Sequence, residues 1–291
     1  MKQLFRIALL CAGISTTAFA ADEKTIFDKW SAAGFTLKQS MTSLTKPASF
    51  SYEQTERESF FASQFALIYT SPTPKAIGND IFFPQFAIEG DLGGTKDDKK
   101  NNFLRAYGSI VQLHSLNPAT VNGFYQRFGP VYEGTKDFSI QNAYAEYEFV
   151  PVYQPLGVGV FKPLVRGIDY QLNPGFLLDT GANIRRTSTA FEQNDTLLRV
   201  IPYMNFALSF SDLSKVLGIH ATILTVGEKV SYLPLEQIKF SNAISTALDF
   251  AFTEHAHLVF SYSRGREAPK FTDVPDLAVK FGLSFGKGVL E

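Results

Sequence analysis

The stretch near the end of the chain, residues 276–288 (DLAVKFGLSFGKG), alternates strictly between two kinds of side chain. Every second residue is apolar: Leu277, Val279, Phe281, Leu283 and Phe285. The residues between them are small or charged: Ala278, Lys280, Gly282 and Ser284. A period of two predicts a β-strand with one apolar face and one polar face. The fold must therefore provide an apolar environment on one side of this strand and tolerate a lysine on the other.

The same alternation recurs upstream, in the segments 176–186, 197–210, 238–252 and 257–263. Strands of globular proteins average about 5–6 residues, whereas a strand that crosses a membrane needs about 9–11. Most of the periodic segments reach the longer length. Their non-apolar faces are rich in Gly, Ala and Ser with a few charges, which suits the inner wall of a curved barrel. A secreted β-sandwich also alternates, but its strands are shorter and its polar face is an open wet surface.

Noisier segments predict further strands near 46–56, 61–70, 80–90, 103–114, 138–152 and 157–171. The total is about twelve strands, with ten or fourteen as alternatives, because residues 116–137 do not fit the pattern neatly. Residues 172–175 and 253–256 are predicted as tight turns and 211–216 as a slightly longer one, whereas 187–195, 227–237 and 264–276 are predicted as long polar loops. Short turns at one end and long loops at the other are typical of outer-membrane barrels.

The first twenty residues have the pattern of a secretory signal peptide. Lys2 and Arg6 precede a short apolar core, and Ala18-Phe19-Ala20 is a small-x-small cleavage site. Residues 21–45 are predicted as an amphipathic periplasmic lead-in that could be helical, and 46–291 as the barrel. Because the single cysteine, Cys11, leaves with the signal, the mature chain has no thiol chemistry.

Composition argues against two classes of protein. Removing Lys2 and Arg6 leaves 25 of the 27 basic residues against 28 acidic ones, so the mature chain lacks the basic excess of a nucleic-acid binder. Past the signal there is no apolar run of the length that a transmembrane helix needs. Aromatic residues make up 14% of the chain, which favours strands.

The strand 276–285 resembles the C-terminal strand of Gram-negative outer-membrane β-barrel proteins, which ends in an aromatic residue. The resemblance implies a closed antiparallel transmembrane β-barrel that reaches the outer membrane after Sec-type export. It also implies contact with membrane lipid and lipopolysaccharide, and with the assembly machinery that reads the last strand. In that class the aromatic residue is usually the last one, whereas here GKGVLE follows Phe285.

The sequence gives little support to an enzyme. Outer-membrane lipases and lipid A deacylases resemble this chain in size and architecture, and they pair a histidine with a nearby serine. His114 and Ser115 are adjacent on a predicted strand and therefore point to opposite faces. His220 and Thr222 share a face, but a threonine without an activating partner is a poor nucleophile. We therefore predict no catalytic residues.

Metal and cofactor binding are not predicted either. His255 and His257 share a face in a predicted turn, but no third ligand beyond Glu254 is evident. The sequence has no phosphate-binding loop and no His-Glu-x-x-His motif. A solvated turn is the simpler interpretation.

The remaining candidate for function is the face of the barrel that points inward. The predicted lumen-lining residues are Arg199, Lys239, Lys280, Asp179, Asp249, Arg185, Glu146, Glu148, Tyr203 and Asn205, with Glu89 and Asn183 on the same faces. Eight strands give a filled interior and sixteen an open channel, so twelve lie between. The sequence predicts a narrow, porin-like channel for small polar solutes. Alternatives are a lipid-modifying hydrolase and a structural or adhesive surface barrel.

Overall fold

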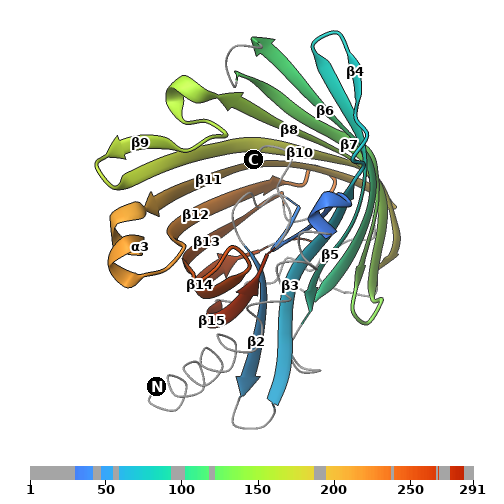
Figure 1. The fold of residues 1–291 in the computed structure, drawn as a ribbon. Coiled ribbons are helices and arrows are strands. Elements are labelled where there is room, and N and C mark those ends of the chain that lie inside the picture. Colours follow the sequence, from blue (N-terminus) through green and yellow to red (C-terminus); the bar gives the residue numbers. More distant parts are fainter. Residues whose placement is uncertain are drawn as a thin grey trace.

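The computed structural model describes residues 30–41, 47–54, 59–92, 102–117, 122–186, 195–236, 239–266, 268 and 276–284. Within them, twelve antiparallel strands form one ring, in which each strand pairs with the next (Figure 1). The strands are β2 (Ala48–Gln54), β3 (Ser59–Thr70), β5 (Asp80–Leu92), β6 (Phe103–Asn117), β7 (Asn122–Thr135), β8 (Ile140–Tyr153), β10 (Ile168–Arg186), β11 (Thr196–Phe210), β12 (Ala221–Tyr232), β13 (Phe240–Ala251), β14 (Ala256–Gly265) and β15 (Asp276–Leu283). The ring closes where Phe281 and Leu283 of β15 pair with Phe50 and Ala48 of β2.

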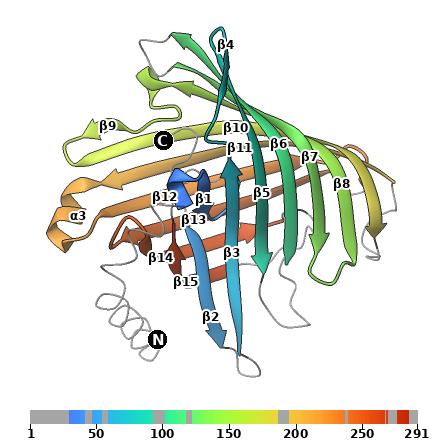
Figure 2. The ribbon, with the colours of Figure 1, turned by 45° about the vertical axis from the view of Figure 1, so that its right-hand side comes forward.

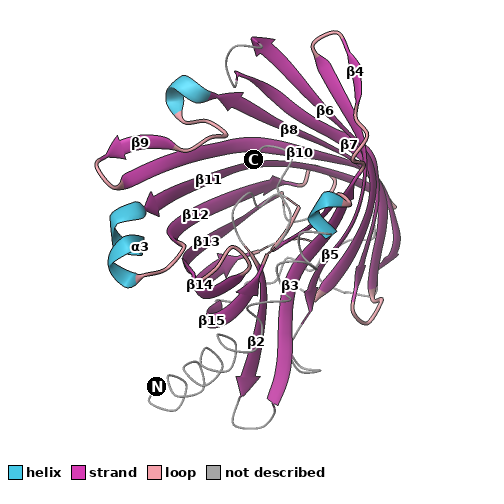
Figure 3. Cartoon of the chain, viewed as in Figure 1, coloured by secondary structure: helices cyan, strands magenta, loops and turns pink. Residues whose placement is uncertain are grey.

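Three short strands lie outside the ring: β1 (Phe35–Lys38), β4 (Lys75–Ile77) and β9 (Lys162–Val165). Strand β1 pairs with the second half of β3, whereas β2 pairs with the first half, so β1 and β2 follow each other along one edge of β3. Two short helices, η1 (Gln154–Leu156) and α3 (Ser211–Leu217), connect strands at the barrel rim (Figures 2 and 3). Among the described residues, no helix has both the length and the apolarity needed to cross a membrane.

The predicted fold class is confirmed: the chain forms a closed, twelve-stranded antiparallel barrel of the outer-membrane type. The predicted number of strands is correct although one strand was missed and one predicted strand is wrong. Strand β7 lies in the region 116–137 that did not fit the pattern, and the predicted strand 157–171 is wrong. That segment contains the short strand β9 and a turn before β10 begins at Ile168.

Two local features of the sequence explain these errors. In β7 the alternation is interrupted by Gly129, where a Cβ atom would lie 2.0 Å from the carbonyl oxygen of Gly108, so only glycine allows β6 and β7 to approach. The predicted turn at 172–175 is also wrong, because Pro174 and Gly175 lie within β10. A Cβ atom at Gly175 would lie 2.5 Å from the ring of Tyr203, so this glycine makes room for an inward-facing tyrosine rather than for a turn.

The predicted contrast between a short-turn end and a long-loop end is not observed. The four-residue connection after β7, residues 136–139, lies at the opposite end from the equally short connection 252–255. Helix α3 and strand β9 lie at the same end as residues 252–255. The predicted loop 227–237 is shorter than expected, because β12 continues to Tyr232.

The two faces of the ring differ in the way the alternation predicts. Large apolar side chains on the outer face are exposed, among them Phe86, Ile88, Phe128, Met204, Val226, Ile244 and Phe260. The inward-facing residues between them are mostly buried and often charged. Closure of the ring allows the backbone groups of the strands to form hydrogen bonds within the sheet. The apolar exterior presents side chains that are compatible with the hydrocarbon of a membrane.

Candidate functional site in the barrel interior

Charged side chains gather on the inner face of five neighbouring strands, from β6 to β11. We call this set the charged wall, and it consists of Arg105, Arg127, Glu133, Glu146, Glu148, Asp179 and Arg199. All except Arg105 are at most 7% exposed. Charges so far from water require partners, because an unpaired buried charge costs several kcal/mol.

Glu133 of β7 is the centre of this wall and has no exposed surface. Its carboxylate accepts hydrogen bonds from Arg105 Nε at 2.6 Å, Arg199 at 2.9 Å and Asn142 Nδ2 at 2.7 Å. Arg199 lies on β11, so its contact with Glu133 passes over the two intervening strands, β8 and β10. It also pairs with Asp179 at 3.5 Å. One carboxylate therefore links both ends of the charged wall.

A second group of contacts surrounds Arg127 of β7. Its guanidinium donates to Glu146 at 2.5 Å and to Glu148 at 2.9 Å, both on the adjacent strand β8. The hydroxyl of Tyr203, which lies on β11, donates to the other oxygen of Glu148 at 2.7 Å. The tyrosine reaches β8 across Gly175, whose missing side chain leaves that space. This arrangement connects the inner faces of β7, β8 and β11.

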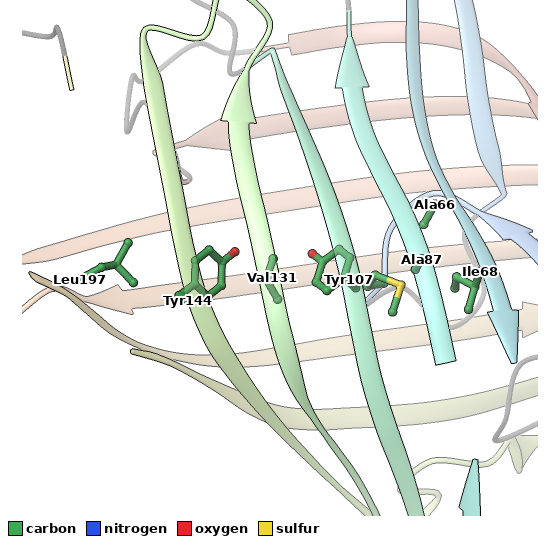
Figure 4. Packing of buried hydrophobic residues seen from close by; sticks show 8 residues of the cluster. Ala66, Ile68, Ala87, Tyr107, Val131, Tyr144 and Leu197 are labelled. Atoms are coloured by element: carbon green, nitrogen blue, oxygen red, sulfur yellow. The ribbon is translucent and has the colours of Figure 1, made fainter. Parts of the chain in front are cut away.

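An apolar row borders the charged wall. It comprises Met41, Ala66, Ile68, Ala87, Tyr107, Val131, Tyr144 and Leu197, all buried, and Figure 4 shows its labelled members lying across neighbouring strands. Tyr107 and Tyr144 join the two sets, because Arg127 lies 5.1 Å from the ring centroid of Tyr107 and Arg199 lies 4.9 Å from that of Tyr144. Met41 comes from the segment between β1 and β2, so part of the predicted lead-in packs inside the barrel.

The opposite part of the inner face, on β11 to β14, carries small and polar residues. We call it the small-residue wall: Asn205, Gly227, Ser245, Ser263, Ala247 and Ser261. The strand register places Asn205, Gly227, Ser245 and Ser263 side by side at one level. Asn205, Ser245, Ser261 and Ser263 are partly exposed although they face inward. These side chains are therefore not fully packed against other protein groups.

The structure brings most of the predicted lumen residues together. Arg199, Asp179, Glu146, Glu148 and Tyr203 belong to the charged wall or contact it directly. Asn205 lies on the small-residue wall.

Lys280 and Asp249 are buried and face inward on β15 and β13. Lys280 donates to the side-chain oxygen of Gln64 at 3.1 Å. Glu89 accepts a hydrogen bond from the hydroxyl of Tyr107 at 2.7 Å.

Two predicted lumen residues lie elsewhere. Lys239 is exposed in the connection before β13 and donates to the carbonyl of Pro234 at 2.8 Å, because β13 begins at Phe240, two residues after the start of the predicted segment 238–252. Arg185 is exposed beyond an irregularity in the pairing of β10 with β8. After this shift it pairs with Gln141, which alternates with the inward-facing residues of β8. A bulge of this kind reverses the face of every residue that follows it.

A third cluster lies where β13, β14 and β15 meet at one end of the barrel. The Nδ1 atom of His257 lies 3.1 Å from both carboxylate oxygens of Asp249, and its Nε2 atom lies 2.8 Å from Ser284 Oγ. Asp249 and His257 are buried, and Ser284 is partly exposed. The sequence search missed this cluster because it compared histidines only with residues close in sequence. The usable signal was the strand register: His257 pairs with Ala251 and with Gly282, so Asp249 and Ser284 each lie two residues from a partner of His257 and share its face.

Nothing in the described part of the chain groups three or more His, Cys, Asp or Glu side chains in a way that could hold a metal ion. The predicted signal peptide, residues 93–101 and Phe285 lie outside the described residues.

Comparisons with known proteins find similarity of shape and no similarity of sequence. No family model matches the chain, and no curated protein matches it. One solved structure with a similar shape is LpxR from Salmonella typhimurium, with 8% identity, a TM-score of 0.39 and coverage of 77% of this chain and 88% of that one. Another is the beta domain of the Bordetella autotransporter BrkA, with 8% identity, a TM-score of 0.37 and coverage of 86% and 96%.

Proposed function

We propose that the protein is a narrow channel for small polar solutes in the bacterial outer membrane. The observation that carries the proposal is the asymmetry of the interior: a bulky, paired charged wall on one side faces small, partly exposed residues on the other. A path for water and small solutes along the small-residue wall needs no rearrangement of the buried ion pairs. Interior side chains of such barrels tune what passes.

The proposal includes the route to the membrane. Residues 1–20 direct Sec-type export, and the assembly machinery recognises the last strand. The apolar outer face then contacts lipid and lipopolysaccharide.

The expected location gives the first test. The mature protein should be recovered with outer membranes, and it should migrate differently on a gel before and after boiling, because a closed barrel resists detergent unfolding. Fractionation of cell envelopes followed by gel electrophoresis measures both properties. Recovery as a soluble periplasmic protein would contradict the proposed location.

The channel itself is tested by recordings in planar bilayers. Ser245→Trp fills part of the small-residue wall and should lower the single-channel conductance roughly twofold or more, because interior residues control passage. Ile244→Trp is the matched control, since Ile244 is the neighbouring residue on the outer face and is 43% exposed. Its conductance should equal that of the unmodified protein. Absence of conductance in the unmodified barrel, or equal effects of both variants, would rule out the proposed path.

A further inference from the structure

We propose that Ser284, His257 and Asp249 form a hydrolytic site for small, water-soluble carboxylic esters. This activity goes beyond the proposed channel and does not depend on conduction, since it needs only solvent access to Ser284. The three side chains have the connectivity that nucleophilic catalysis requires: a hydroxyl bonded to a histidine, whose second nitrogen is held by a carboxylate.

The roles follow from the hydrogen-bond geometry. The carboxylate of Asp249 accepts the Nδ1 proton of His257, which leaves the Nε2 lone pair directed at Ser284 Oγ, 2.8 Å away. The hydroxyl has one other acceptor within reach, the carbonyl oxygen of Glu254 at 3.2 Å, and the shorter contact is to the histidine. Asp249 therefore fixes the tautomer of His257, and His257 is placed to remove the proton of Ser284.

The backbone around Ser284 is held in place from both directions. Its N–H donates to the carbonyl of His255 at 3.0 Å, and its carbonyl lies 3.0 Å from His255 Nδ1. Opposite His257, β15 carries Gly282, where a Cβ atom would lie only 3.0 Å from the Cβ of His257. A nucleophile set on fixed backbone beside a packed histidine is preorganised for reaction.

The position of the cluster selects the substrate class. Asp249 and His257 point to the inner face of the barrel, and the inner face of β13 and β14 continues from them into the small-residue wall. The outer, apolar face is separated from the cluster by the sheet itself. An ester that reaches Ser284 must therefore pass through water, which favours short polar esters over membrane lipids.

The reaction balances with water as the only co-reactant. Ser284 Oγ bonds to the ester carbonyl carbon while His257 Nε2 takes the hydroxyl proton. The ester C–O bond then breaks, and the alcohol leaves with that proton. A water molecule, deprotonated by the same nitrogen, then bonds to the acyl carbon. The bond from that carbon to Ser284 Oγ breaks, Oγ takes the proton back from His257, and the carboxylic acid is released.

Covalent labelling of the full-length protein in detergent tests the site. A small fluorophosphonate should label the folded barrel, and mass spectrometry should place the label on Ser284. Ser284→Ala and His257→Gln should abolish labelling and lower hydrolysis of a short p-nitrophenyl ester roughly 100-fold or more. Asp249→Asn should reduce both. Ser109→Ala, which changes an inward-facing serine of β6 outside the small-residue wall, is the matched control and should label normally.

A second experiment measures the basicity of His257 directly, through the reactivity of a cysteine placed at position 284. It does not depend on ester hydrolysis. The chain's only cysteine lies in the predicted signal peptide, so Ser284→Cys introduces a single thiol. Its alkylation by iodoacetamide should be roughly tenfold faster with His257 than with His257→Gln, because a neighbouring base favours the thiolate. Gel mobility before and after boiling confirms folding in each variant. No label on the unmodified protein, a label that survives Ser284→Ala, or equal alkylation rates would overturn the proposal.

Discussion

Glu133→Gln is expected to destabilise the folded barrel by about 3 kcal/mol or more, since breaking a buried ion pair leaves charges without compensation. Glu133 is fully buried and accepts from Arg105, Arg199 and Asn142. A glutamine keeps one acceptor oxygen but directs an amide N–H₂ group at guanidinium donors. Glu89 at 3.9 Å and Asp179 at 3.5 Å still oppose the two arginines, which keeps the loss below that of an isolated charge.

Urea unfolding in lipid vesicles measures this effect. Glu254→Gln is the control, because Glu254 is exposed in the turn before β14, and its stability change should stay within about 0.5 kcal/mol. Adding Arg199→Met to Glu133→Gln should cost less than the sum of the two single changes, since contacting residues couple. Equal stability of Glu133→Gln and Glu254→Gln would mean that the charged wall does not hold the barrel together.

The period of two was sufficient to predict the barrel because one rule governs every strand. A residue on β11 or β13 faces either lipid or interior, and lipid excludes charge. The faces predicted for residues 198–210 and 240–251 are accordingly those observed. The strand prediction failed at positions where a glycine is required by the close approach of a neighbouring strand or side chain, because such a glycine interrupts the alternation. Gly129 and Gly175 read as interruptions, yet each is a glycine because a neighbouring strand or ring occupies the space of its Cβ atom.

The candidate sites were predictable to different degrees. Charged residues on a polar face must lie inside a barrel, so four of the seven residues of the charged wall were found from the pattern alone. Arg127 and Glu133 were missed because they lie in the region 116–137 that did not fit the pattern. The pairing of Arg199 with Glu133 was not, because 66 residues separate them in sequence and only the curvature of the sheet brings them together. For the same reason, the contact between Ser284 and His257 was not predicted, because 27 residues separate them in sequence. Contacts between strands depend on register, and a single bulge such as that before Arg185 changes it.

The second large effect concerns the lipid-facing surface. Phe260→Arg should destabilise the barrel by about 2–4 kcal/mol, the cost of an arginine near the bilayer midplane of such a barrel. Phe260 lies near the middle of β14, on the outer face, and is 39% exposed. Ser261→Arg is the matched control, because the adjacent residue faces inward beside Ala247 and is partly exposed.

Neighbouring residues at the end of β15, such as Leu283 and Gly282, are less suited to this test. A Cβ atom at Gly282 would lie 2.8 Å from Pro47, so a change there disturbs packing whichever face it lies on.

Folding into lipid vesicles, followed by urea titration and by the gel shift on boiling, measures the stability of both arginine variants. The expected order is a large loss for Phe260→Arg and a much smaller one for Ser261→Arg. Since the two residues are neighbours on one strand, both changes place an arginine at nearly the same position along the barrel. Equal losses would contradict the assignment of lipid to the outer face, and the reverse order would place lipid against the small-residue wall.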